Sequence, residues 1–167
     1  MVFLFSALII QAQTLTSSEY KLKAVFIYNF IHFIDWPEST FEDSYDAFII
    51  GIVGGDPFGT YIDEAVAGER IKSHRIIVER FNEAEDIEKC HILFINTHDP
   101  DETKRILNVT ASRNILTVSD TPNFIRWGGM VRFFTEADRI RLEINNTLAR
   151  ARELKISSKL LRVAIVQ

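Results

Sequence analysis

The chain contains one cysteine among 167 residues, so no disulfide can form within it. Cys90 stands directly before the apolar run His91-Ile-Leu-Phe-Ile95, which favours a buried, inert thiol over a reactive or metal-bound one. The histidines show neither HExxH nor paired-cysteine spacing; they are His32, His74, His91 and His98. We therefore predict no metal site.

An excess of basic residues is also missing. The formal net charge is -4 and the isoelectric point is near 5.6, which argues against a general nucleic-acid-binding protein. The apolar share of 47% and the charged share of 25% are those of an ordinary globular protein, and the length suits one domain. No internal repeat, low-complexity segment or linker divides the chain.

The signature motifs of nucleotide binding and hydrolysis are absent as well. Gly54-Gly55-Asp56-Pro57 is neither GxGxxG nor GxxxxGK[ST], and Asp56 would repel a phosphate. No GxSxG motif surrounds Ser119. The sequence therefore predicts no cofactor and favours a protein that is not an enzyme.

The segment from residue 48 to 66 predicts a strand, a glycine loop and a helix. Phe48 to Val53 is a nearly continuous apolar run, typical of a strand buried on both faces in a parallel sheet. Gly54 and Gly55 permit a sharp turn. Asp56 is then expected to cap a helix whose first turn holds Pro57. One apolar helical face follows, formed by Phe58, Tyr61, Ile62, Ala65 and Val66.

Further apolar runs predict strands at residues 75–81, 90–96 and 115–118. Asp99, Pro100 and Glu102 have capping-box spacing and predict a helix that ends near residue 112. Residues 130–135 and 140–145 predict a hairpin, and helices are expected over residues 146–154 and 157–166. This alternation predicts an α/β fold in three layers, Rossmann- or flavodoxin-like. Its mostly parallel sheet is flanked by helices on both faces and has an antiparallel hairpin at one edge.

A strongly apolar helix is predicted near the start of the chain. Thr16 and Glu19 have capping-box spacing, and Pro37 ends the helix. A helix that is apolar nearly all round is expected to be buried on more than one side. The domain core or a second protein can supply that burial, with the core preferred. Phe26 and Phe30 are the candidate contacts to a partner.

Residues 1–13 predict a signal peptide, and residues 14–167 a single domain. Val2 to Ile10 is an apolar run too short to span a bilayer as a helix, and Ala12 offers a small residue before a cleavage point near Gln13. A positively charged start is missing apart from the α-amine. A buried N-terminal strand is the alternative, and export to the periplasm is the preferred interpretation.

Ligands of open α/β sheets bind beyond the carboxyl ends of the strands. The candidate ligand-binding residues at that edge are Gly54, Gly55, Asp56, His98, Ser119 and Asp120. A turn followed by a helix cap explains the glycine loop without a ligand and is preferred. A hydrolase with Ser119 as nucleophile, beside His98 and Asp120 or Asp56, is a less favoured alternative.

Basic residues gather near the C-terminus. Arg150, Arg152 and Lys155 are the candidates for contact to a partner. They can form a solvated face, or they can face acidic partner residues or lipid headgroups near a membrane. A charge reversal such as Arg152→Glu would test that face.

Several blocks of sequence, taken in order, carry a resemblance to a known family. They are Tyr20-Lys-Leu-Lys-Ala-Val-Phe-Ile-Tyr-Asn-Phe30 with Trp36-Pro37, Ile52-Val-Gly-Gly-Asp-Pro-Phe-Gly59, Cys90-His-Ile-Leu-Phe-Ile95, Ile115-Leu-Thr-Val-Ser-Asp120, Gly128-Gly-Met-Val, Ile144-Asn145 and Ile156-Ser-Ser-Lys-Leu-Leu161. From about Tyr20 to Ala164 the chain resembles the YfiR family of bacterial periplasmic proteins. The ordered set is more specific than any single block.

The resemblance implies an exported regulator with a compact α/β fold, often dimeric, that is not an enzyme. Relatives bind the periplasmic sensor part of a membrane-anchored diguanylate cyclase and hold that enzyme inactive, and release raises cyclic di-GMP and favours biofilm growth. Relatives that respond to redox state use cysteine pairs, which the lone Cys90 cannot provide.

We therefore expect a periplasmic protein that represses such a cyclase, or a similar sensor, by direct contact, with a homodimer as a further expected assembly. The alternative function is a periplasmic receptor for a small ligand at the glycine-loop edge.

Overall fold

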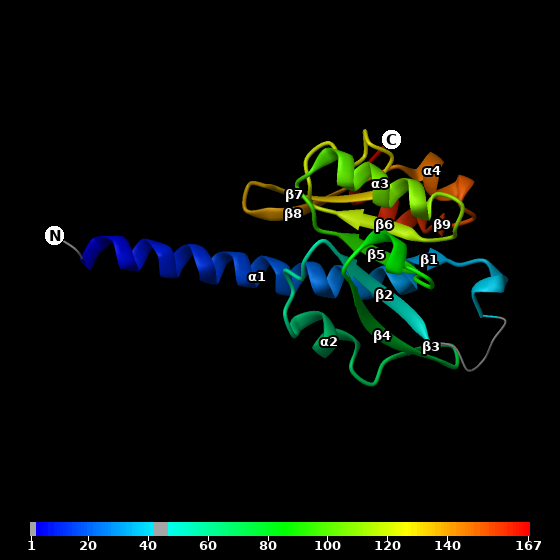
Figure 1. The fold of residues 1–167 in the computed structure, drawn as a ribbon, viewed down its shortest axis with the longest axis horizontal. Helices are drawn as coiled ribbons and strands as arrows, with labels where there is room; N and C mark the ends of the chain where they lie inside the picture. Colours follow the sequence, from blue (N-terminus) through cyan, green and yellow to red (C-terminus); the bar gives the residue numbers. More distant parts are fainter. Residues whose placement is uncertain (1–2, 42–46) are drawn as a thin grey trace.

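An eight-stranded sheet forms the centre of the molecule (Figure 1). The computed structural model describes residues 3–41 and 47–167, with side chains described from Ser17 onward. The strands are β1 (Ile34–Asp35), β2 (Phe48–Val53), β3 (Arg70–Ile71), β4 (His74–Phe81), β5 (Ile92–Ile95), β6 (Leu116–Ser119), β7 (Val131–Glu136), β8 (Arg139–Ile144), β9 (Lys155–Ile156) and β10 (Ala164–Val166). The helices are α1 (Phe3–Phe33), α2 (Tyr61–Val66), α3 (Pro100–Thr110), α4 (Asn146–Ala151) and α5 (Ser158–Leu161), with short 3-10 helices η1 (Glu38–Phe41) and η2 (Ala84–Asp86).

Five adjacent strands run parallel, in the spatial order β4-β2-β5-β6-β7. Numbered along the chain, this is the order 2-1-3-4-5 of flavodoxin-like folds. Antiparallel neighbours flank the parallel group, with β3 beside β4 and β8 beside β7. The prediction of an α/β fold with a mostly parallel sheet is confirmed.

Both faces of the sheet are covered, because the residues of each central strand alternate between two cores. In β5, Ile92 and Phe94 belong to the core that α1 and α2 also line. Leu93 and Ile95 belong to the second core, to which α3 contributes Ile106. Helices therefore lie on both faces, as predicted. Burial on both sides also explains why the central strands are continuous apolar runs in the sequence.

The longest helix, α1, begins at Phe3 and not at Thr16, so the predicted capping box does not start it. Residues 3–33 contain no glycine or proline, and nothing in the backbone interrupts the helix. The alternative of an N-terminal strand is wrong, since residues 3–10 are helical. The predicted signal peptide falls on the first turns of α1, except that residues 1 and 2 lie outside the described residues.

Figure 1 shows the first half of α1 extending away from the body of the molecule, while its second half packs onto the sheet. In the described part of the chain, no helix combines the length and the apolar character needed to cross a membrane.

The last segment of the chain differs from the helix predicted over residues 157–166. A single short helix, α5, is followed by β10, which pairs in parallel with β8. Val163, Ile165 and Val166 are β-branched and favour a strand once β8 offers an edge to pair with. β10 is consequently the edge strand, and the β7–β8 hairpin lies next to it inside the sheet, contrary to the prediction of a hairpin at the edge.

Asp99 caps α3 as predicted. Its Oδ1 accepts hydrogen bonds from the backbone N–H groups of Asp101 at 2.9 Å and Glu102 at 3.4 Å. The carboxylate of Glu102 pairs with Arg105 instead of completing the capping box.

Asp56, in contrast, does not cap a helix, because α2 begins only at Tyr61. Its Oδ1 accepts a hydrogen bond from the backbone N–H of Phe58 at 2.7 Å, and its Oδ2 accepts one from Arg80 Nε at 2.9 Å. Asp56 thus fixes the turn after the glycines and joins it to β4.

Cys90 and His91 are buried just before β5. Burial raises the pKa of the Cys90 thiol to about 12, so the thiol is inert at neutral pH. His91 Nδ1 accepts a hydrogen bond from the backbone N–H of Ile49 at 2.8 Å, and its ring stacks on Phe48 with centroids 4.5 Å apart. Burial, and then the nearby Lys89 ammonium, lowers the pKa of His91 to about 4.

We expect His91 to make the protein sensitive to acid. Its pKa is about 4 in the folded state against 6.5 for an ordinary histidine, so the folded protein binds fewer protons than the unfolded chain between these values. The stabilisation is therefore complete above pH 6.5 and is lost as the pH falls towards 4, by up to about 3 kcal/mol.

Urea unfolding of the wild type and of His91→Asn measures this effect, because the asparagine oxygen can accept the same hydrogen bond without titrating. The stability advantage of the wild type should shrink as the pH falls. An advantage that stays constant from neutral pH to about pH 4 would contradict the assignment.

Candidate functional site

The three loops predicted to bind a ligand meet at one edge of the sheet, beyond the carboxyl ends of β2, β5 and β6. The switch point of the sheet lies there, between β2 and β5. Gly54 has a left-handed φ of 84°, and a Cβ at this position would lie 2.5 Å from the carbonyl oxygen of Asn96. The loops after β2 and β5 are therefore in backbone contact, which leaves no space between them at this point.

Ser119 is buried, and its hydroxyl serves the backbone. It donates a hydrogen bond to the carbonyl oxygen of Ile95 at 2.7 Å and accepts one from the N–H of Thr121 at 3.1 Å. His98 is exposed and is not a partner of this hydroxyl. The arrangement gives no support to a serine hydrolase. No group of three or more His, Cys, Asp or Glu residues in the described segments is placed to hold a metal ion.

Asp120 is bound by the first helix. Its Oδ2 accepts hydrogen bonds from the Tyr20 hydroxyl at 2.9 Å and from Lys23 Nζ at 2.6 Å. Lys23 is only 3% exposed and also pairs with Glu19 at 2.6 Å. Burial, and then the charge of Asp120, raises the pKa of Tyr20. A buried ammonium group needs such partners, so this network fixes α1 to the end of β6.

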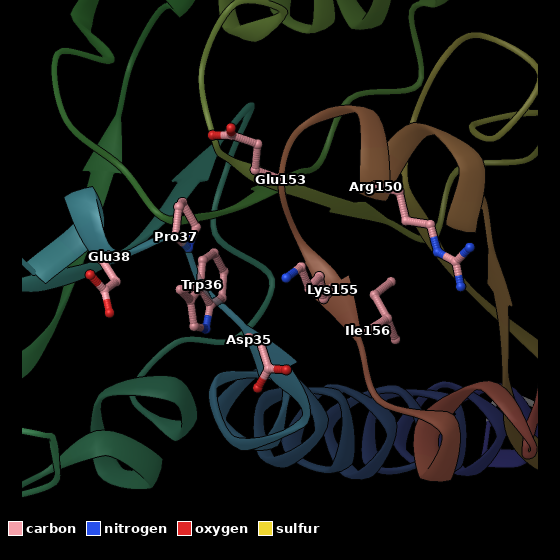
Figure 2. A pocket seen from close by; sticks show the side chains of 8 residues that line it. All are labelled: Asp35, Trp36, Pro37, Glu38, Arg150, Glu153, Lys155 and Ile156. Atoms are coloured by element: carbon pink, nitrogen blue, oxygen red, sulfur yellow. The ribbon is translucent and has the colours of Figure 1, made fainter.

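A groove of about 710 Å³ lies beyond the C-terminal end of α1 (Figure 2). β1 and β9 form it by pairing antiparallel, with Ile34 opposite Ile156 and Asp35 opposite Lys155. This pairing brings the segment after α1 beside the segment after α4. The lining residues are Asp35, Trp36, Pro37, Glu38, Arg150, Glu153, Lys155 and Ile156.

Trp36 gives the groove an apolar wall. Its ring packs edge-on against Phe48 with centroids 5.0 Å apart, and its Nε1 donates a hydrogen bond to the carbonyl oxygen of Ile31 at 3.4 Å. Both contacts anchor the indole to the core, so this wall is held rigidly.

Charged residues line both sides of the groove. In Figure 2, Asp35 and Glu38 lie on the side of Trp36, whereas Arg150 and Lys155, together with the acidic Glu153, come from the segment of α4 and β9. Both basic side chains are exposed, and within the part of the chain that the structure describes neither forms an ion pair. They are therefore available to acidic groups of another molecule.

The structure separates the predicted partner residues. Arg150 and Lys155 come together in the groove, but Arg152 is half-buried and lines a different cavity of about 190 Å³ beside α3.

The aromatic residues predicted for the same role belong to the domain itself. Phe30 is 1% exposed and stacks on Phe133 of β7 with centroids 5.9 Å apart, so it is not an exposed contact. Phe26 is half-buried against the same ring. Within the part of α1 whose side chains are described, from Ser17 to Phe33, the exposed large apolar residues are Leu22 at 48% and Val25 at 43%.

The structure shows a further surface that the sequence does not predict, because its last segment favours a helix. On the outer side of β7, β8 and β10, Arg132 pairs with Glu143 at 2.7 Å, and Gln167 donates a hydrogen bond to the same carboxylate. The Arg132 guanidinium lies 4.9 Å from the ring centre of Phe134. Ile165 extends this side of the sheet. We call these five residues the β8 face; the polar and apolar alternation of β7 was its only signal in the sequence.

Residues 20–165 match the family model described as YfiR/HmsC-like. The chain belongs to the YfiR/HmsC-like family. The match includes both segments of the groove, the glycine-loop edge and most of the β8 face. Members of the YfiR/HmsC-like family are periplasmic regulators and not catalysts, which supports the regulatory class predicted from the sequence. No curated protein matches the chain.

We expect the Lys23–Asp120 pair to contribute strongly to stability. Asp120→Asn keeps the shape of the side chain but leaves the buried Lys23 with Glu19 as its ionic partner, so the free energy of unfolding should fall by about 3 kcal/mol. Asp138→Asn is the matched control, because Asp138 is an exposed turn residue and its change should cost less than about 0.5 kcal/mol. Equal losses in urea unfolding would refute the role of the pair.

Proposed function

We propose that this YfiR/HmsC-like protein represses a membrane-anchored diguanylate cyclase, or a similar sensor protein, by direct contact in the periplasm. The observation that carries the proposal is the family match over residues 20–165. Repression of this kind needs no catalysis, since a protein that binds the inactive state of its partner more tightly shifts the partner towards that state. Release of the contact then raises cyclic di-GMP.

The groove beside Trp36 is the contact surface that we assign to this partner. It combines an anchored aromatic wall with the cations of Arg150 and Lys155, which form no ion pair with the described residues. Buried aromatic groups with charged residues at the rim are typical of protein interfaces. A partner segment with an apolar side chain next to carboxylates fits this arrangement.

In-cell crosslinking of the tagged protein, with mass spectrometry of the captured membrane fraction, identifies the partner. A captured transmembrane protein with a cyclase domain is the expected result. Self-crosslinks without any membrane partner would contradict the proposal.

We expect Arg150→Glu to weaken binding to the periplasmic part of that partner about tenfold, because the reversal places a carboxylate where the partner presents acidic groups. Arg126→Glu is the matched control, since Arg126 is also exposed but lies in the turn after β6, outside the residues that line the groove. Titration calorimetry compares the two variants. The same affinity in both would remove the groove from the interface.

A second candidate function is a periplasmic receptor for a small ligand. The groove supports it, because a volume of about 710 Å³ lies in the usual range of ligand pockets. The glycine-loop edge around Gly54, Gly55 and Asp56 suits such a ligand less well than the groove, because the loops after β2 and β5 are in contact there.

A thermal-shift screen with small periplasmic metabolites tests the receptor function, because a ligand that binds only the native state raises the melting temperature. A shift that Arg150→Glu abolishes would assign the ligand to the groove. A screen without any shift would count against the receptor function.

A further inference from the structure

The cavity of about 190 Å³ beside α3 has its own chemistry. Its walls come from α3, from β6 and the turn after it, and from α4 with the residue that ends that helix. It shares no lining residue with the groove beside Trp36, so the two sites can be tested separately. The lining residues are Leu107, Asn108, Thr110, Ala111, Ile115, Thr117, Trp127, Gly128, Met130, Leu148 and Arg152.

Arg152 gives this cavity a positive charge. It is half-buried, and its guanidinium forms neither an ion pair nor a hydrogen bond with any residue that the structure describes. None of the residues that line the cavity is acidic. A partly buried cation is stabilised by an anion nearby, and an anion placed here would meet no carboxylate in the walls.

Two further hydrogen-bond donors line the same cavity. The half-buried Trp127 has no acceptor for its indole N–H among the described residues. The hydroxyl of Thr117, which is 3% exposed, accepts a hydrogen bond from the backbone N–H of Met130 at 3.1 Å. Its own hydrogen has no acceptor in the described part of the chain. A carboxylate has two oxygens with about four acceptor positions, so one carboxylate can satisfy all three donors.

The other walls are mainly hydrocarbon, supplied by Leu107, Ile115, Met130 and Leu148. The volume of about 190 Å³ is below the range of about 300 to 1,000 Å³ that is usual for pockets of drug-sized ligands. It corresponds to about six water molecules at about 30 Å³ each. The cavity therefore suits a small molecule with one anionic end and a short apolar chain.

We propose that this cavity binds a short aliphatic monocarboxylate. The carboxylate accepts hydrogen bonds from Arg152, Trp127 and Thr117, and the hydrocarbon chain packs against the four apolar side chains. An α-amino acid is a poorer ligand, because its ammonium group would find no acidic residue in the walls to pair with. The inference concerns the chain alone and does not depend on a cyclase partner.

Butyrate is the probe, and nuclear magnetic resonance of the ¹⁵N-labelled full chain is the measurement. The chain has two tryptophans and so gives two indole N–H signals. Trp127 lines the cavity, whereas Trp36 lines the groove and donates its indole hydrogen to Ile31. Trp127→Phe identifies the two signals. Butyrate should shift the Trp127 signal in a saturable manner and leave the Trp36 signal in place.

Arg152→Gln removes the charge and should raise the dissociation constant for butyrate at least about tenfold. Arg150→Gln is the matched control, because Arg150 belongs to the same segment but lines the groove, and its affinity for butyrate should equal that of the wild type. Butyramide has the shape of butyrate without the charge. It should bind the wild type at least about tenfold more weakly, which tests the anion site even if Arg152→Gln does not fold.

Three results would overturn the proposal. The first is a Trp127 signal that does not move with butyrate, and the second is a shift of the Trp36 signal in its place, which would put the acid in the groove. The third is equal binding of butyrate and butyramide to the wild type, or equal affinity of the wild type and a folded Arg152→Gln for butyrate.

Discussion

The buried ion pair between Lys23 and Asp120 determines where the longest helix lies on the sheet, and the other surfaces depend on that position. At the far end of α1, the carbonyl oxygen of Phe33 accepts a hydrogen bond from Ser157 at 2.8 Å, and β1 then pairs with β9. About 15 Å of helix separates the two attachments. Since a helix of this kind is stiff, the ion pair at one end of the sheet and the groove at the other are parts of one rigid unit.

The fold retains the strand order of flavodoxin-like proteins, but its exposed binding groups lie away from the switch point of the sheet. At the switch point, the polar side chains bind other parts of the same chain. Ser119 donates a hydrogen bond to the backbone, and Asp120 binds Lys23 of α1. Arg150 and Lys155, which form no ion pair with the described residues, lie in the groove, and the uncharged strand β10 lies at the sheet edge. This distribution suits a protein that acts by binding other proteins at its periphery, as expected of a YfiR/HmsC-like regulator.

The elements that could be predicted from the sequence are those decided by local chemistry or by burial on both faces. β2 was predicted with its observed bounds because its neighbours cover both sides, and the cap at Asp99 was predicted because Pro100 follows it. The β7–β8 hairpin was predicted from its flanking strands, and Ala137 and Asp138 adopt the positive φ values that a tight hairpin turn requires.

The errors concern elements whose state depends on distant parts of the chain. β10 is a strand because it pairs with β8. The sequence of residues 157–166 alone does not indicate that β8 lies beside it. An apolar side chain such as Phe30 suits both a contact to a partner and a place in the core. Only its position opposite Phe133 assigns it to the core. The groove was recognised only in part, through Arg150 and Lys155, because the pairing of β1 with β9 joins segments far apart in the sequence.

The contact between Gly54 and the Asn96 carbonyl limits how the switch point of this chain can open. A pocket usually opens when a large side chain is exchanged for a smaller one, which needs only one substitution. Here the obstruction is main chain against main chain, and glycine is already the smallest residue. New space between these two loops would therefore require a change in loop length and not a smaller residue at position 54.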